Sequence, residues 1–207
     1  MKNNKYSFAR SLYELVEMFA IAMAAALIVM ALFIRHSPVS GHSMYPTLLG
    51  STVSSADEFA APEGKNDILI VATLPTKIKD GDIIVTQTKN SMQDPYVKRV
   101  IATGGQTLSI DFESWTVTVD GKVLDESYVH REETQMLTET FYESMSGCEK
   151  DENGAYIIPE GYVFCMGDNR NHSSDSRDSR VGLIDERFIL GKAVFRIYPF
   201  DRIGVVN

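Results

Sequence analysis

A continuous apolar segment near the start of the chain limits what this sequence can fold into. Residues 18–34 form a run of 17 residues without a charged side chain. This length is at the short end of what spans a bilayer, and Leu15 and Val16 extend it if Glu17 lies at the interface. The run is apolar on every face of a helix, whereas a surface helix of a soluble domain is apolar on one stripe. We therefore expect a transmembrane helix over about residues 15–34.

Basic residues around this segment predict its orientation. Lys2, Lys5 and Arg10 precede the run, and only Arg35 follows it closely. The more basic flank of a span stays in the cytoplasm, so the N-terminus is expected inside the cell and the rest of the chain outside. A cleaved signal peptide is the alternative, but the run is longer than a usual signal-peptide core.

The chain is expected to have two parts. Residues 1–36 hold a cytoplasmic N-terminus and a single transmembrane helix, and residues 37–207 form an extracytoplasmic domain long enough for one core. The net charge of -8 and the pI near 5.0 argue against a nucleic-acid surface, which would be basic. Cys148 and Cys165 are too few for a disulfide framework, and they either form one bond or remain thiols.

The second part reads as mainly β. Short β-branched and aromatic runs next to turn residues are typical of strands. Such runs occupy residues 67–72, 82–86, 96–101, 107–110, 115–119, 156–158, 162–166 and 192–198, the last expected as the final strand. Asp120 and Gly121 predict a tight hairpin turn. We expect a β sandwich or barrel, with a polar insertion over about residues 129–152 that holds a short helix near 131–140.

Ser43 lies in a segment rich in turn-forming residues shortly after the apolar run. A serine hydroxyl is a weak nucleophile and needs a base beside it. His42 is poorly placed for this, since neighbours in an extended chain point to opposite faces. His172 is the one histidine suited to the role, and with Asp168 or Asp175 it leaves a Ser-His-Asp triad open.

Lys98 is the better candidate for the base. Alternation along a strand places Tyr96, Lys98 and Val100 on one face and Arg99 on the other. If the face with Lys98 is the buried one, the amine loses its proton near neutral pH and can accept a proton from a serine.

Four segments after the apolar run carry a family resemblance. They are residues 40–47 (SGHSMYPT), 81–85 (GDIIV), 96–101 (YVKRVI) and 167–177 (GDNRNHSSDSR). Their content and order resemble the type I signal peptidases, serine peptidases of family S26 that remove signal peptides from exported proteins. The last segment is very specific and the second is weak. The resemblance covers essentially the whole chain.

The resemblance implies a Ser-Lys dyad. Ser43 would attack the scissile carbonyl, Lys98 would be the general base, and Ser173 would orient Lys98 by a hydrogen bond. The Ser43 backbone N–H would donate to the oxyanion. Gly41 stands where some bacterial members carry a serine that adds a second donor, so that donor is in doubt.

Further residues are expected to support this dyad. Asp175 and Arg177 would form a structural pair that braces the site, although the repeated Asp-Ser-Arg at residues 178–180 leaves a shift by three positions open. Tyr96 shares the strand face of Lys98. Gly167 would allow a backbone turn.

The resemblance also implies the substrate and partners. Small residues are expected one and three positions before the cut, as in Ala-x-Ala. Met44, Tyr45, Ile83 and Val85 are the candidates for lining the substrate pockets. The expected partners are signal peptides of exported preproteins and the lipid bilayer, with no nucleic acid, no metal and no cofactor, and the protein is expected to be a monomer.

Two other functions remain open at this level. One is an inactive membrane-anchored module that binds signal peptides, against which the presence of both Ser43 and Lys98 argues. The other is a triad protease that uses His172. A metal-dependent hydrolase is poorly supported, because the sequence lacks a His-Glu metal-binding motif on a helix, and the spacing of its aspartates does not match a calcium loop.

Overall fold

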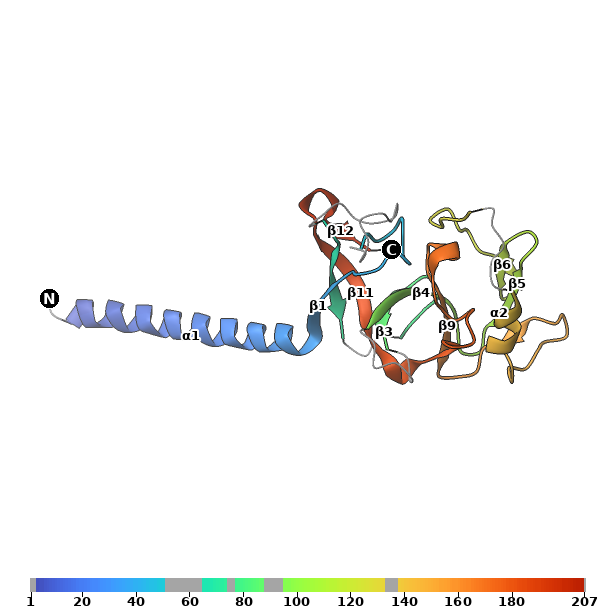
Figure 1. Ribbon diagram of the computed structural model, residues 1–207. Helices are drawn as coiled ribbons and strands as arrows, with labels where there is room; N and C mark the ends of the chain where they lie inside the picture. Colours follow the sequence, from blue (N-terminus) through green and yellow to red (C-terminus); the bar gives the residue numbers. More distant parts are fainter. Residues whose placement is uncertain (1–2, 51–64, 74–76, 88–94, 133–137, 207) are drawn as a thin grey trace. The chain divides into compact units, whose positions relative to one another are not determined.

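The computed structural model of the protein (Figure 1) divides into two compact units, residues 1–35 and 36–207. It describes residues 3–50, 65–73, 77–87, 95–132 and 138–206. The first unit is a single helix, α1 (Asn3–Phe33), and its segment Phe8–Phe33 is long and apolar enough to cross a membrane. At about 1.5 Å of rise per residue, the 26 residues of that segment extend about 39 Å, more than a hydrocarbon core of about 30 Å.

The end of α1 differs from the sequence expectation by one residue. Ile34 was assigned to the span, but the helix ends at Phe33, and β1 (Ile34–Pro38) begins directly. β1 is the edge strand of a sheet and is followed along that sheet by β2 (Ile68–Ala72). Pairing with a distant strand therefore decides the conformation of these residues, which hydropathy alone assigns to the helix.

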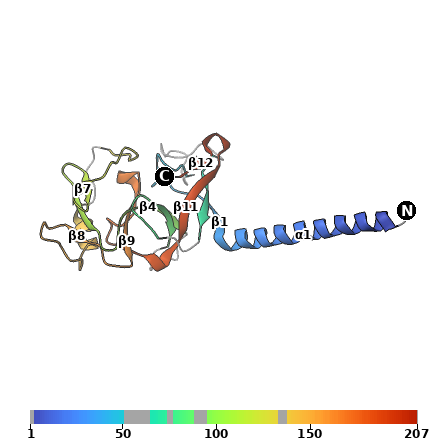
Figure 2. The same cartoon turned by 180° about the vertical axis from the view of Figure 1, so that it is seen from behind.

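The second unit is mainly β, as expected, and its larger sheet is strongly curled (Figures 1 and 2). The order in the sheet is β1, β2, β11 (Ile189–Tyr198), β3 (Ile83–Thr86), β4 (Tyr96–Thr103), β9 (Tyr162–Met166) and β10 (Ile184–Asp185), and β12 (Gly204–Val205) pairs with β11. The two-residue strands β10 and β12 were not expected from the sequence, because two residues carry no readable alternation. β12 also shows that residues 192–198 do not form the final strand.

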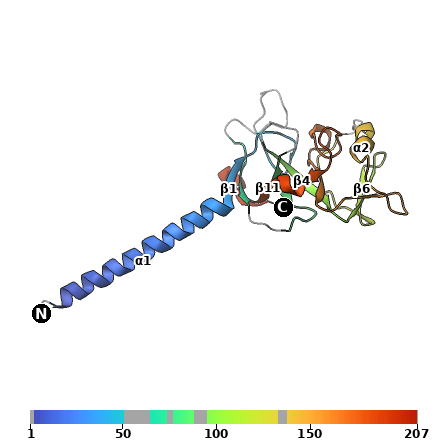
Figure 3. The same ribbon diagram turned by 90° about the horizontal axis from the view of Figure 1, so that it is seen from below.

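A smaller sheet has the order β7 (Lys122–Val123), β6 (Thr116–Val119), β5 (Thr107–Asp111) and β8 (Tyr156–Ile157). The expected hairpin joins β6 to β7, with positive φ angles of 49° at Asp120 and 74° at Gly121. Helix α2 (Thr138–Ser144) lies beside this sheet (Figures 1 and 3) and buries Phe141 in one cluster with Leu108 and Val117.

Three short 3₁₀ helices complete the described elements: η1 (Arg170–His172), η2 (Glu186–Phe188) and η3 (Phe200–Arg202). The helix expected near residues 131–140 coincides only in part with α2, and residues 133–137 lie outside the described residues.

Strand β4 is buried on both faces. Val97 packs in a cluster with Met44, while Val100 packs in another with Cys165. Lys98 and Arg99 are 4% and 3% exposed, so neither charge reaches bulk water. We expected only the Lys98 face of this strand to be buried, but the curled sheet covers the Arg99 face as well. This burial sets the chemistry of both side chains.

Candidate active site

The Ser43 segment (residues 40–47) is a series of turns, and it is held by buried side chains on one side and by hydrogen bonds from Asn169 on the other. Met44 and Leu48 are fully buried, and Leu48 N–H donates to the Met44 carbonyl at 2.8 Å. The Asn169 backbone N–H donates to the Ser43 carbonyl at 3.0 Å, and the Asn169 side-chain amide donates to the His42 carbonyl at 3.2 Å. The Ser43 backbone is therefore held between a core anchor and the segment after β9.

Lys98 faces the Ser43 hydroxyl. Its Nζ lies 2.8 Å from Ser43 Oγ and donates a second hydrogen bond to the Val97 carbonyl at 3.2 Å. The Tyr96 ring lies beneath it, with the ring centroid 5.1 Å from Nζ. Alternation along β4 therefore places Tyr96 and Lys98 together, as expected.

The surroundings of Lys98 weaken its hold on a proton. Burial is the largest cause and lowers the pKa of Lys98 from 10.5 to about 8. The positive charge of Arg177 lowers this pKa further, whereas Asp175, Cys165 and Asp168 act in the opposite direction. A substantial fraction of the amine is then neutral in slightly alkaline solution and can accept a proton from Ser43.

Gly167 is required by close approach and not by a turn. A Cβ at this position would lie 2.3 Å from the Ser43 carbonyl oxygen and 2.3 Å from Ser173 Oγ. Gly167 is also absent from the described glycines with positive φ, so the expected turn conformation is not the reason for it. The missing side chain lets the segment after β9 pack directly against the backbone of Ser43.

Ser173 lies near Ser43 but does not make the expected contact. Its Oγ is buried, and no hydrogen bond joins it to Lys98. The expected Ser173–Lys98 hydrogen bond is thus not formed in this structure. The side chain is instead packed against Gly167, where its hydroxyl rotamer decides what it can reach.

Asp168 joins the Ser43 segment to β4. Its carboxylate accepts two hydrogen bonds from Arg99, both of 2.8 Å, and one from Thr47 Oγ1 at 2.5 Å. The Arg99 and Asp168 side chains are 4% and 0% exposed, so each charge depends on the other for solvation. Sequence analysis missed this pair, because its members are 69 positions apart.

The Asp175–Arg177 pair braces the other side of the segment. Asp175 accepts two hydrogen bonds of 2.8 Å from Arg177 and one of 2.9 Å from the Gly167 backbone N–H. Burial alone would raise the pKa of Asp175, but the Arg177 charge outweighs it and holds that pKa below its usual value. Asp178 pairs instead with Arg180, whose side chain is 79% exposed. The buried brace is therefore the first of the two repeated motifs.

The buried carboxylate of Asp67 anchors the end of the Ser43 segment. Asp67 is 0% exposed and accepts from Arg196 at 2.8 Å and from Arg202 at 3.3 Å. Arg196 also donates to the Thr47 carbonyl at 3.0 Å. This cluster was not expected from the sequence, in which Asp67 is simply the first residue of the strand-like run 67–72.

The residues expected to bind substrate lie mainly inside the core. Met44, Ile83 and Val85 are 1%, 2% and 4% exposed and share one hydrophobic cluster, while Tyr45 is half-buried. Buried side chains such as these can form only the innermost surface of a substrate pocket. Their role in substrate binding stays a prediction.

His172 has a different environment from that of a triad base. Its Nε2 lies 2.6 Å from Glu132 Oε1, and its ring packs edge-on against His42 at 5.8 Å. Ser43 Oγ is hydrogen-bonded to Lys98 and not to an imidazole.

Cys148 and Cys165 are free thiols in the structure. Among the described residues, no group of three His, Cys, Asp or Glu side chains is arranged to hold a metal ion.

Comparison with known proteins gives the family of the chain. Residues 12–198 match the family described as signal peptidase, peptidase S26. The chain belongs to this family, and the resemblance seen in its sequence motifs is confirmed. It is accordingly a peptidase of a family whose members remove signal peptides.

Individual relatives carry the name signal peptidase I. The chain is 33% identical to signal peptidase I of Bacillus licheniformis, over 93% of this chain and 92% of the relative. It is 28% identical to signal peptidase I S of Bacillus subtilis over the full length of both, and 30% identical to signal peptidase IB of Staphylococcus aureus over 93% and 92%. A crystal structure of a signal peptidase I from Enterococcus faecalis aligns with 56% of this chain and 97% of its own, at 25% identity and a TM-score of 0.40.

Proposed function

We propose that the protein is a membrane-bound serine endopeptidase that cuts signal peptides from exported preproteins with a Ser43–Lys98 dyad. The observation that carries this proposal is the 2.8 Å contact between Lys98 Nζ and Ser43 Oγ inside a buried site. A base must lie within hydrogen-bond reach of the proton it removes, and its pKa must lie near the working pH. Lys98 meets both conditions.

The first half of the reaction follows from this geometry. Neutral Lys98 accepts the Ser43 hydroxyl proton as Oγ attacks the carbonyl of the last signal-peptide residue, and a tetrahedral oxyanion forms. The Ser43 backbone N–H donates no hydrogen bond within the described structure, so it is available to the oxyanion. Protonated Lys98 then gives its proton to the leaving amine, and the signal peptide remains as an ester on Ser43.

The second half reverses the roles. The mature protein leaves, water enters, and Lys98 removes a proton from that water as it attacks the ester. The proton returns to Ser43 Oγ, and the free signal peptide carries a new carboxylate. The hydrogen bond from Lys98 to the Val97 carbonyl keeps Nζ oriented toward Ser43 through both steps.

The preference for small residues before the cut and the membrane topology belong to the same proposal. Helix α1 is apolar around its circumference, and its described side chains are exposed, as in a helix that meets lipid. With Lys2, Lys5 and Arg10 on the cytoplasmic side, the peptidase unit lies outside the cell, where an exported chain emerges.

One experiment tests the dyad directly. A preprotein with an Ala-x-Ala site is incubated with the detergent-solubilised protein, and the cut is located by mass spectrometry. Ser43→Ala and Lys98→Met should each abolish cleavage, while His172→Ala should retain it. Cleavage that survives in Lys98→Met and is lost in His172→Ala would replace the dyad by a triad. A parent protein that binds the preprotein without cutting it would favour the binding module.

A further inference from the structure

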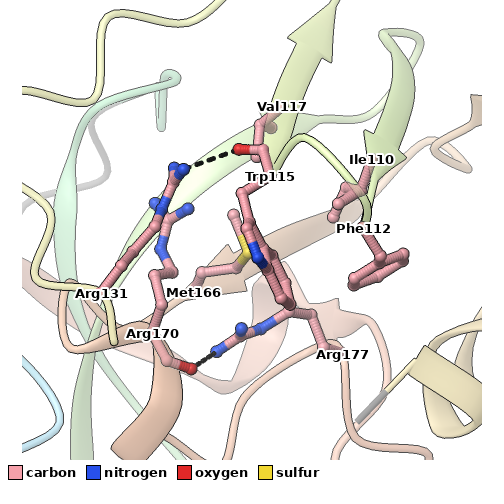
Figure 4. A pocket seen from close by; sticks show the side chains of 8 residues that line it. All are labelled: Ile110, Phe112, Trp115, Val117, Arg131, Met166, Arg170 and Arg177. Atoms are coloured by element: carbon pink, nitrogen blue, oxygen red, sulfur yellow. Dashed lines mark hydrogen bonds between the residues drawn. The ribbon is translucent and has the colours of Figure 1, made fainter. Parts of the chain in front are cut away.

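A second polar site lies behind the segment that holds Ser43. A small, partly open pocket lies between β6, the end of β9 and the residues after it (Figure 4). Its apolar wall includes Phe112, Trp115 and Met166. Three arginines complete the lining: Arg131, Arg170 and Arg177. Arg170 and Arg177 belong to the motif of residues 167–177, but the proposed cleavage reaction gives the pocket itself no role.

The arginines around the cavity carry one more charge than their partners balance. Arg177 pairs with Asp175. Arg131 and Arg170 share the single carboxylate of Glu126. Arg131 contacts its Oε2 and Arg170 contacts its Oε1. Their guanidinium groups accordingly lie beside each other in Figure 4. One carboxylate for two cations leaves a net positive charge beside the buried Arg170, whose side chain is 2% exposed against 28% for Arg131. An uncompensated charge next to a buried cation is costly unless an anion balances it.

Two donors of this pair are unused. Arg170 Nη2 and Arg131 Nε are buried and donate no hydrogen bond within the described part of the chain. The Arg170 residue is only 3% exposed, so bulk water does not solvate it freely. Burial, followed by the repulsion of Arg177, lowers the pKa of Arg170 to about 10. An unpaired donor on a buried cation is the feature that an anion would satisfy.

We propose that this cavity binds one small monovalent anion, for which chloride is the probe, between Arg131 and Arg170. A small monatomic ion needs the least space beside the two buried donors, so chloride is the simplest probe of this site. A single negative charge brings Arg131, Arg170 and Glu126 to neutrality. The apolar residues of the lining offer no competing polar group and strengthen the electrostatic attraction.

The anion would stabilise the backbone next to the nucleophile. Arg170 Nε donates to the Gly167 carbonyl at 3.1 Å, and Arg177 donates to the Arg170 carbonyl at 2.8 Å. Gly167 in turn packs against the Ser43 carbonyl. An occupied site therefore stabilises the segment 167–177 without contact with the substrate, and it does not depend on which residue is the catalytic base.

Thermal unfolding of the full-length protein in detergent tests this site. Sodium chloride is exchanged for sodium gluconate at constant ionic strength. Chloride should raise the unfolding midpoint in a saturable way, and bromide should act in the same manner, because both are monatomic and gluconate is too large. Crystals grown in bromide should show an anomalous peak beside Arg170. Equal midpoints in chloride and gluconate, or a cavity filled by water alone, would overturn the proposal.

Variants connect the effect to this cavity. Arg131→Gln removes the excess charge and should raise the half-saturating chloride concentration by about tenfold or more. Arg180→Gln is the control, because it also removes one arginine charge but Arg180 does not line the pocket, and it should respond to chloride as the parent does. If Arg131→Gln does not fold, Val117→Ile fills the cavity while it keeps every charge, and it should also weaken the response. An unchanged response in the folded variant would refute the site.

Discussion

Lys98 Nζ and Ser43 Oγ lie 2.8 Å apart, although the two residues are separated by 55 positions in the chain. The contact depends on three packed segments: the turns around Ser43, strand β4 and the residues after β9. Asp168 joins them, since it binds Thr47 on the first segment and Arg99 on the second. The reactive pair is thus held by an electrostatic framework that is itself buried.

The activity should depend on pH through Lys98. The base works as a neutral amine, and its pKa is lowered to about 8, so kcat/KM should rise with pH and level off above that value. Below it, kcat/KM should fall about tenfold for each pH unit, since each unit reduces the neutral fraction tenfold. Rate profiles on an Ala-x-Ala peptide measure this. His172→Ala should leave the midpoint in place, whereas a midpoint near 6.5 that disappears in that variant would identify an imidazole instead.

Replacement of Lys98 should stabilise the fold at neutral pH. The pKa of Lys98 is about 8 in the folded protein and 10.5 when unperturbed. Between these values the unfolded chain binds more protons, so the contribution of Lys98 to stability rises with pH and is least favourable below pH 8. Lys98→Met should therefore gain roughly 3 kcal/mol in the free energy of unfolding at pH 7. Denaturant unfolding at pH 7 and pH 10 should show a gain that shrinks as the pH rises. A gain independent of pH would mean that packing, and not charge, is responsible.

Gly167→Ala should impair catalysis by moving the nucleophile. The added Cβ would meet the Ser43 carbonyl oxygen and Ser173 Oγ at 2.3 Å each, so the Ser43 backbone must shift. Misplacement by about 1 Å commonly costs about 10²-fold in rate, and we expect a loss of that order in kcat. Gly204→Ala is the control, because its Cβ would meet no atom within 4 Å. Equal activity in the two variants would show that the approach at Gly167 does not position Ser43.

Asp168→Asn should strongly destabilise the fold. The change leaves the Arg99 cation buried without a counter-charge, which typically costs about 3–5 kcal/mol. Arg180→Gln removes the exposed member of a pair whose carboxylate keeps its backbone hydrogen bond from Arg180 N–H, and it should cost less than Asp168→Asn. The double change Asp168→Asn with Arg99→Met should recover part of the loss, because no unpaired charge remains. Chemical denaturation of the four proteins provides the comparison, and a double variant no more stable than Asp168→Asn alone would contradict the charge argument.

Sequence patterns predicted most of the elements. The strands over residues 96–101, 107–110 and 162–166 are confirmed, since each has enough residues for its alternation to be read. β10 and β12 were missed because two-residue strands exist only through their partners. The Ser173–Lys98 hydrogen bond expected from the resemblance is not formed in this structure.

Local sequence patterns were enough to predict the apolar helix, the mainly β character and the order of the motifs, and the family match agrees with them. These properties depend on neighbours within one segment, where hydropathy and turn chemistry act locally. The family resemblance led us to expect Lys98 beside Ser43, but the distance between them, the Arg99–Asp168 pair and the close approach at Gly167 come from the three-dimensional packing. Desolvation and contact are set by segments far apart in the chain, so neither a lowered pKa nor a buried ion pair can be read from local pattern.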